Sequence, residues 1–428
     1  MGLTLIRKRK GAPPRDARVA LVLAGGAVSG GAFKVGGLKA LDDFLVGRRI
    51  NDLDLYVGLS AGSVLAVPLA AGITPNEMVR VLDGTSRRFD QLRPTDFYHP
   101  NLRELAGRPA AFAWEWMTYG PLLAAEVVQQ LPTLPHAVGA AARTALRRPG
   151  YASFERLATS LLEPFAPERS LPSVADHIPS GLFDSAGLER WLRRNLERIR
   201  IPNDFGAFTE RTGRDLFVCA CNLDTAERVV FGHGALEGAT ISQAVQASAA
   251  LPGFYKPARI AGVDYVDGGV RHTANIDVAI ERGADLIICY NPFRPFVNDV
   301  VGGGRFLADR GMRLVINQVF RTLLHSRLQL GIQRYLNDHR FQGDIVLLEP
   351  TEQDARFFAL NPLAFWRRGE ALRHGFESVW ATIDRNFEEL ADVLGGYGLE
   401  MSRDAASRRA RQVRKLRGWG IDPESAAA

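Results

Sequence analysis

The first part of the chain alternates between short apolar runs of strand length and longer helix-like stretches. Val19–Leu23 is apolar at every position, which is typical of a central parallel strand covered on both faces. A glycine-rich segment follows it, and then a helix-like stretch over Phe33–Val46. Leu55–Val57 predicts a second short strand, and Ser60–Ala71 predicts the helix after it. This order predicts a βαβ unit with a right-handed crossover.

A similar alternation returns in the second half of the chain. Apolar runs of four to eight residues predict further strands there, and stretches of helical periodicity lie between them. We expect strands at Asp215–Asn222, Arg228–Phe231, Gly262–Val266, Ala284–Tyr290 and Ile345–Leu348, and helices at Ile241–Ala250, Asn275–Arg282 and Gly369–Leu394.

Residues 80–180 interrupt this alternation. The stretch is rich in proline, shows no strand pattern, and is expected to be a helical, aromatic-rich insertion. Its aromatic side chains would form either the core of a small helical cap or a lid over an apolar substrate cleft, and the two functions are compatible. The cluster consists of Phe112, Trp114, Trp116, Met117 and Tyr119.

The two ends of the chain differ from the part between them. Residues 1–18 are basic, contain proline and are expected to be a disordered tail, while residues 19–395 are expected to form one domain that includes the insertion. Residues 396–428 are rich in arginine with a thin apolar face, which favours a solvated terminal helix or tail over a membrane-surface helix. The uncharged run Leu55–Thr74 is long enough to span a bilayer. Its three glycines and Pro68 instead indicate a strand, a sharp turn and a buried helix.

Composition narrows the classes of partner and compartment. The net charge of +6 and pI of 9.4 suit an anionic membrane surface or an acidic substrate. No basic stripe with interleaved aromatic residues occurs, so we expect no nucleic-acid partner. Three cysteines form no disulfide framework, and Met1–Arg18 has no apolar signal segment, so a reducing, cytoplasmic location is expected. Cys219 and Cys221 are expected to be small buried apolar residues and not metal ligands.

The first chemical motif is Gly58-Leu59-Ser60-Ala61-Gly62, between a predicted strand and an apolar helix. A serine on a strained strand-to-helix turn needs small neighbours so that the backbone can bend tightly. Such a turn exposes the hydroxyl and aims the N-terminus of the new helix at a reacting carbonyl. The alternative is a structural glycine-rich turn.

The second motif is the glycine-rich segment Gly25–Gly31 after the first strand, whose backbone N–H groups could face an anion. One candidate anion is a phosphate, as in a dinucleotide-binding turn. However, no acidic residue ends a strand about twenty residues later, and no Gly-Lys-Ser/Thr follows. The other candidate is the oxyanion of a tetrahedral intermediate, which requires preorganised N–H donors.

The third motif is Asp267-Gly268-Gly269 after a predicted strand, and alone it would indicate a hairpin turn. A serine nucleophile needs a base, which is usually histidine. None of the eight histidines has a recognisable catalytic context, so a histidine triad stays possible but without support. His272 is close to Asp267 in sequence and is expected to lie at the surface or to support the site indirectly.

Taken together, these motifs resemble the patatin-like phospholipase family. The resemblance covers about residues 18–80 and 180–295, is weaker over 345–395, and is absent from the insertion and the C-terminal tail. The matching segments are Leu21–Gly26, Gly36–Leu41, Gly58–Ser63, Cys221–Thr225 with Val229–Phe231, Ala244–Pro252 and Tyr265–Gly269.

The resemblance implies a three-layer α/β/α fold with a central, mostly parallel sheet and a helical insertion. It implies a serine lipid acyl hydrolase of the phospholipase A type, with Ser60 as nucleophile and Asp267 as base in a Ser–Asp dyad, and no cofactor or metal. A lipid or phospholipid would be the substrate, with peripheral contact to the membrane surface. The oxyanion donors would come from Gly25, Gly26, Ala27, Gly30 and Ala61, and the motif glycines are Gly58, Gly62, Gly268 and Gly269.

The glycine-rich segment departs from the family pattern. Ala27 stands in place of a third glycine, and Ser29 stands in place of a basic residue. Lys34 could supply the missing charge, but we expect it to face solvent on a helix. Two alternatives therefore stay open: a soluble esterase, thioesterase or acyltransferase with the same dyad, and a catalytically silent lipid-binding protein.

Overall fold

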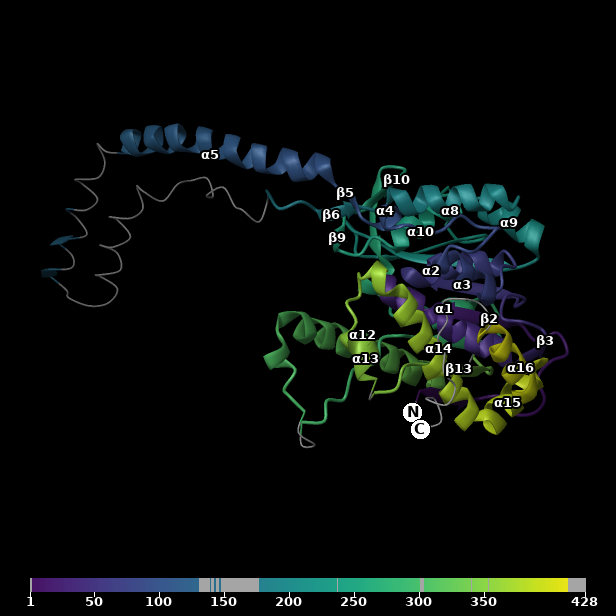
Figure 1. The fold of residues 1–428 in the computed structure, drawn as a ribbon. Helices are drawn as coiled ribbons and strands as arrows, with labels where there is room; N and C mark the ends of the chain where they lie inside the picture. The colour runs from purple at the N-terminus through teal and green to yellow at the C-terminus, as the bar shows by residue number, and fades with distance from the viewer. Residues whose placement is uncertain are drawn as a thin grey trace. The chain divides into compact units, whose positions relative to one another are not determined.

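The computed structural model describes residues 2–130, 139, 142–143, 146–147, 177–236, 238–300, 304–339, 341–352 and 354–414. The chain divides into two compact units. Unit 1 comprises Met1–His99 and Phe183–Ala428, and unit 2 comprises Pro100–Leu182. The predicted site residues all belong to unit 1, whose helices surround a central sheet (Figure 1).

The central sheet of unit 1 has nine strands in the order β1-β13-β12-β2-β4-β7-β11-β10, with β8 paired to β7. The pairs from β13 through β12, β2 and β4 to β7 are parallel. The pairs that involve β1, β8, β10 and β11 are antiparallel. The strands are β1 Leu3–Arg7, β2 Val19–Leu23, β4 Leu55–Leu59, β7 Asp215–Asn222, β8 Arg228–Gly232, β10 Ala258–Ile260, β11 Val263–Asp267, β12 Leu286–Tyr290 and β13 Asp344–Leu348.

Helices cover both faces of this sheet. Alternate residues of β2 point to opposite faces: Leu21 packs into the larger core with α1 and α14, and Val22 packs into the smaller core with α11 and α12. The expected three-layer α/β/α fold is therefore confirmed. The helices of unit 1 are α1 Ala27–Phe44, α2 Ala61–Ala70, α3 Pro75–Asp83, α4 Pro94–Phe97, α8 Ala186–Arg198, α9 Phe205–Thr212, α10 Ile241–Ser248, α11 Ile276–Glu281, α12 Met312–Asn337, α13 Ala355–Ala359, α14 Arg368–Arg385, α15 Phe387–Gly396 and α16 Arg403–Arg414.

The expected strands and helices of the alternating regions are present, with shifts of a few residues at their ends. The uncharged run Leu55–Thr74 forms β4 and α2, as expected for a buried strand and helix. The expected helix Gly369–Leu394 is interrupted at Asn386, between α14 and α15. Cys219 and Cys221 are buried in β7 with free thiols, as expected. No helix among the described residues is long and apolar enough to cross a membrane.

The N-terminal segment is not the disordered tail that its composition suggested. Its strand β1 pairs with β13, with Leu3 opposite Leu348 and Ile6 opposite Ile345. Leu3 and Ile6 are buried on opposite faces of the sheet. Five residues are enough to form an edge strand, and the surrounding basic residues concealed this short apolar alternation.

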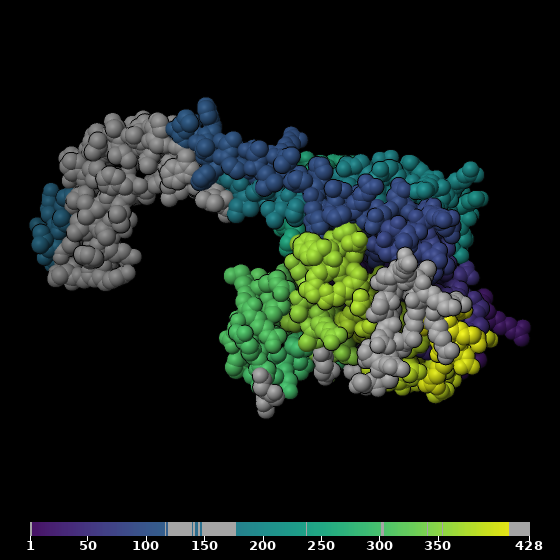
Figure 2. Space-filling model, in the orientation of Figure 1, coloured from purple at the N-terminus to yellow at the C-terminus, as the bar shows by residue number. Residues whose placement is uncertain are grey.

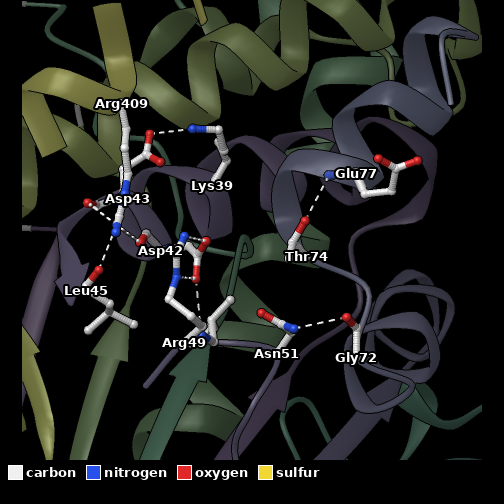
Figure 3. Close-up of polar contacts among 11 residues, drawn as sticks. Lys39, Asp42, Asp43, Leu45, Arg49, Asn51, Gly72, Thr74, Glu77 and Arg409 are labelled. Carbon is white, nitrogen blue, oxygen red and sulfur yellow. Dashed lines mark hydrogen bonds and ion pairs between the residues drawn. The ribbon is translucent and has the colours of Figure 1, made fainter. Parts of the chain in front are cut away.

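The C-terminal segment also contributes a strand and a helix to unit 1. A short strand β14, Leu399–Met401, pairs with β3, Leu45–Gly47. Figure 3 shows Arg409 of α16 at the C-terminal end of α1, where its Nη1 donates to the carbonyls of Asp43 (2.9 Å) and Leu45 (2.7 Å). The last carbonyls of a helix lack intrahelical partners, so this arginine caps α1. Residues 415–428 lie outside the described part of the chain.

The insertion begins later than the sequence suggested. Residues 80–99 belong to unit 1, where Phe89 is buried and its ring lies 6.2 Å from that of Trp191. A separate sheet consists of three short strands, β5 His99–Pro100, β6 Gly181–Asp184 and β9 Gly253–Tyr255.

Unit 2 contains the long helix α5, Leu102–Gln130, as expected for a helical insertion. Trp114 and Met117 are each 67% exposed on α5, so they are not core residues of a cap. Phe112 packs on His177, whereas the side chains of Trp116 and Tyr119 lie outside the described set. A lid function for this helix stays a prediction.

One long helix, α12, was not predicted. Its 26 residues carry apolar side chains on both the buried and the exposed side, so the hydrophobic pattern lacks the single apolar stripe that usually identifies a helix.

Candidate active site

Ser60 lies on a sharp turn between β4 and α2. Its backbone has φ 53° and ψ −129°, a conformation that costs energy for a residue with a side chain. The neighbouring glycines make room for the turn: a Cβ on Gly62 would lie 2.1 Å from the Leu23 carbonyl oxygen, and one on Gly58 would lie 2.4 Å from the Ser63 Cα. Both motif glycines are thus required by close backbone contacts.

Two other serines hold this turn in place. The Ser60 N–H donates to Ser248 Oγ (2.8 Å), and Ser248 Oγ donates to the Cys219 carbonyl (2.6 Å). Ser63 Oγ donates to the Ser60 carbonyl at 2.6 Å. Sequence reasoning gave Ser248 no function, although it lies in the segment Ala244–Pro252 that matched the family pattern.

Asp267 reaches Ser60 because β4 and β11 follow one another along the same edge of β7. Leu59, the last residue of β4, is paired with Cys219, and Asp267, the last residue of β11, is paired with Ala220. The other edge of β7 is taken by β8. Consecutive positions on β7 therefore bring together two residues that are far apart in the sequence.

The Ser60 hydroxyl lies close enough to the Asp267 carboxylate to lower the pKa of that carboxyl group. The N–H of Gly269 also donates to Asp267 Oδ1 at 2.8 Å. Ser60 and Asp267 are only 6% and 4% exposed. Burial raises the pKa of Asp267 to about 6, although the hydrogen bonds and the charge of Lys34 act in the opposite direction. The carboxylate is thus a stronger base than an ordinary aspartate but still ionised near neutral pH.

The glycine-rich segment lies against Ser60. A Cβ on Gly25 would lie 3.3 Å from the Ser60 Cβ. Helix α1 begins at Ala27 and α2 at Ala61, and the first N–H groups of a helix have no intrahelical partner. Both helix N-termini therefore adjoin the hydroxyl of Ser60, as an oxyanion site requires.

The predicted donor Gly30 does not fit this arrangement. Its N–H donates to the Gly26 carbonyl, four residues earlier, at 2.9 Å. This is the regular backbone hydrogen bond of an α-helix, so the N–H is not free to hold an oxyanion. The N–H of Ser29, which takes the place of the family's basic residue, donates to the Pro362 carbonyl at 3.0 Å. The remaining predicted donors are Gly25, Gly26, Ala27 and Ala61.

Lys34 is fully buried, and our expectation that it faces solvent is wrong. Its Nζ donates to the carbonyl oxygens of Ala24 and Gly25, the latter at 3.0 Å. In a trans peptide the C=O and the following N–H point in opposite directions. Bonds from Lys34 to these two carbonyls therefore direct the N–H groups of Gly25 and Gly26 away from the lysine.

Lys34 thus brings an amine to the glycine-rich segment from a position five residues after Ser29. Burial lowers the pKa of Lys34 to about 7, and the nearby Asp267 carboxylate acts against that decrease. Lysine is rarely buried in proteins, so the sequence gave no signal that Lys34 would be. Only its packing beneath the glycine-rich segment reveals it.

An apolar cavity of about 80 Å³ opens beside Ser60. Val28, Val35 and Val64 supply part of its wall from α1 and α2, and Leu363 and Phe365 supply another part. The Tyr98 hydroxyl donates to the Leu363 carbonyl, which fixes this second wall. The cavity suits an acyl chain better than a polar group.

Three of the histidines lie elsewhere in unit 1. His374 bonds to Asp354, and His325 lies 3.5 Å from Glu349. His272 lines a separate cavity between α11 and α12. Among the described residues, no group of three or more His, Cys, Asp or Glu side chains is placed to hold a metal ion.

A comparison with protein families gives a match over most of the chain. The family model described as "Patatin-like phospholipase" matches residues 21–280, which is more than half of the chain. The matched range contains Ser60, Lys34 and Asp267.

Two solved structures show low similarity. VipD from Legionella pneumophila is 17% identical, with 90% of this chain and 70% of that chain covered and a TM-score of 0.34. ExoU from the type III secretion system of Pseudomonas aeruginosa, solved with SpcU, is 17% identical, with 91% and 62% covered and a TM-score of 0.26. Similarity at this level carries no information about the activity of this chain.

Proposed function

Because the chain belongs to the patatin-like phospholipase family, we propose that it cleaves carboxylic ester bonds of membrane lipids with Ser60 as nucleophile and Asp267 as base. The family supports lipid ester hydrolysis in general. The finer part of the proposal is the phospholipase A type of reaction, in which a fatty acid leaves a glycerophospholipid and the lysophospholipid remains.

Acylation begins when Ser60 Oγ attacks the ester carbonyl carbon while its proton moves to the Asp267 carboxylate. The negative oxygen of the tetrahedral intermediate accepts hydrogen bonds from the N–H groups of Gly25, Gly26, Ala27 and Ala61. When the C–O bond to the alcohol breaks, Asp267 returns the proton to the leaving oxygen. This step has two products. One is the lysolipid, which leaves as the free alcohol, and the other is an acyl ester on Ser60.

Deacylation repeats these steps with water in place of the serine. Asp267 takes a proton from the water molecule as its oxygen attacks the acyl carbonyl, and the same N–H groups hold the oxyanion. The proton then passes to Ser60 Oγ, and the fatty acid leaves. One carboxylate can perform both transfers because its pKa of about 6 is close to neutral pH.

The observation that carries this proposal is the buried pair formed by the Ser60 hydroxyl and the Asp267 carboxylate, beside two helix N-termini. A hairpin aspartate with no chemical function would gain nothing from burial, since an ionised carboxylate is costly to desolvate. The apolar cavity next to Ser60 supports an acyl chain as the group on the carbonyl side.

The test is incubation with mixed phospholipid vesicles and mass analysis of the released fatty acids and lysolipids. We expect Ser60→Ala and Asp267→Asn to abolish release and also labelling by a fluorophosphonate probe. Ser242→Ala is the matched control, because Ser242 is a buried serine on α10 away from the cavity. It should keep wild-type release.

Other outcomes separate the alternatives. Release at the wild-type rate from folded Ser60→Ala would overturn the nucleophile. A folded wild-type protein whose Ser60 resists the probe would favour a silent lipid-binding protein. Faster turnover of short monomeric esters than of vesicles would favour an esterase.

A further inference from the structure

Helix α12 has two apolar faces, and among the described residues one of them is buried in unit 1 while the other is exposed. Leu314, Leu328 and Ile332 are buried, and Leu328 and Ile332 pack into the smaller core. The opposite face carries a row of large apolar side chains that are between 45% and 76% exposed. This row, the α12 stripe, consists of Met312, Ile316, Val319, Leu323 and Leu330.

The stripe follows helical periodicity. Its members are spaced four, three, four and seven residues apart, which places them on one side of an α-helix. The buried Arg321 follows Met312 by nine residues, or about two and a half turns, and so lies on the opposite side. Val315 and Phe320, 39% and 59% exposed, widen the stripe. Figure 2 shows the green region that contains α12 at the surface of the molecule.

The charge of α12 restricts what can cover the stripe. The helix contains four arginines and no aspartate or glutamate. Arg313, Arg327 and Arg334 are exposed, and Arg327 and Arg334 continue the side that carries the stripe. A second copy of α12 would offer no carboxylate to these arginines. An anionic lipid surface offers both an apolar interior and negative head groups.

Helix α12 also contacts two segments of the candidate site. Arg327 Nη1 donates to the Val270 carbonyl at 2.8 Å, and Thr273 Oγ1 donates to the Leu324 carbonyl at 2.9 Å. Both bonds join α12 to the segment directly after Asp267. Arg321 Nη1 donates to the carbonyl of Pro292 at 3.1 Å, and a Cβ on Gly26 would lie 3.0 Å from the ring of Pro292.

We propose that α12 is the membrane-docking helix of this protein, with the stripe inserted among the acyl chains of an anionic bilayer and Arg313, Arg327 and Arg334 at the head groups. The helix lies along the surface, since its arginines prevent it from crossing the hydrocarbon layer. Docking there places lipid near the segment that follows Asp267 and near the glycine-rich segment. The inference rests on the proposed function for its choice of a lipid partner.

The first test is co-sedimentation of the full chain with phosphatidylcholine vesicles that contain or lack phosphatidylglycerol. We expect binding to require phosphatidylglycerol and to weaken at high salt. Ile316→Glu with Leu323→Glu should weaken binding at least about tenfold, because two charges would enter the apolar layer. The matched control is Leu223→Glu with Leu236→Glu, whose leucines are 48% and 45% exposed outside α12, and it should bind as wild type does.

A second measurement reports what covers the stripe. Val319→Cys can be labelled selectively with an environment-sensitive dye, since Cys219, Cys221 and Cys289 are buried. We expect the emission to shift to shorter wavelength only when phosphatidylglycerol vesicles are added. A shifted emission without vesicles would mean that another part of the chain or a second copy covers the stripe, which overturns the proposal.

Hydrolysis of a short monomeric ester separates this inference from the proposed function. The Ile316→Glu, Leu323→Glu variant should hydrolyse it at the wild-type rate, because neither residue lines the cavity beside Ser60. Undiminished vesicle binding by this variant would overturn the docking face while leaving the hydrolase intact. A wild-type protein that docks through the stripe but hydrolyses nothing would overturn the proposed function instead.

Discussion

Two buried ionisable residues, Asp267 and Lys34, set the chemistry of the candidate site. Each carries a pKa displaced toward neutrality by burial, upward for the acid and downward for the amine. Lys34 also holds the carbonyls of Ala24 and Gly25, so it acts on the predicted oxyanion donors through the backbone. We therefore regard Lys34 as a positioning residue.

The pKa of Asp267 predicts the pH dependence of the reaction. Because the base must be ionised, kcat/KM should rise with pH and level off above about 6, falling about tenfold per unit below that value. The measurement is a pH profile with a monomeric ester. A profile in which kcat/KM decreases only near the ordinary pKa of aspartate, or does not decrease at low pH, would contradict a buried carboxylate base.

Lys34→Met should lower kcat roughly tenfold to a hundredfold with a smaller change in KM, since the oxyanion donors lose their orientation. The substitution should also raise the pH below which kcat/KM decreases, because the charge of Lys34 lowers the pKa of Asp267. Lys39→Met is the matched control: Lys39 is a buried lysine on the same helix, paired with Asp43. Lys39→Met should lower the stability of the protein without changing the pH below which kcat/KM decreases. Equal pH profiles for the two variants would contradict the positioning role.

At the scale of elements, the order of strands on β7 explains how the site forms. β4 and β11 occupy successive parts of one edge, so the strand pairing itself sets the separation of Ser60 and Asp267. The N-terminal strand β1 extends the same sheet at its far end. Its burial implies that residues once expected to be a tail contribute to stability.

Ile6→Ala should lower the free energy of unfolding by about 2–4 kcal/mol, because it removes a buried side chain that packs in the smaller core. Thr4→Ala is the control on the same strand, where the side chain is exposed. Urea denaturation measures both. A change of less than about 0.5 kcal/mol for Ile6→Ala would mean that β1 is not part of the folded sheet in solution.

At the scale of the whole molecule, the described walls of the cavity beside Ser60 all come from unit 1. Unit 2 is held together at its base by the Asn101 N–H, which donates to the Leu182 carbonyl at 3.0 Å. The two ends of unit 2 therefore lie next to each other, as in an insertion that can be removed without disrupting its host domain.

Replacing residues 102–181 with a short glycine–serine linker should leave unit 1 folded and Ser60 reactive. We expect hydrolysis of a monomeric ester to stay within about threefold of the full chain. The measurement is ester turnover together with fluorophosphonate labelling, with Ser60→Ala in the shortened chain as the blank. A folded but unlabelled protein would show that unit 2 contributes to the site.

The sequence by itself determined the two turns at Ser60 and Asp267 and the strands that precede them. Those features depend on local requirements, namely glycines where the backbone bends and apolar runs where a strand is buried on both faces. Only the tertiary structure decided the burial of Lys34, the hydrogen bond from Ser60 to Ser248, the pairing of β1 and the exposed stripe of α12. Each of these depends on neighbours that are distant in the chain, and no local pattern of residues encodes such neighbours.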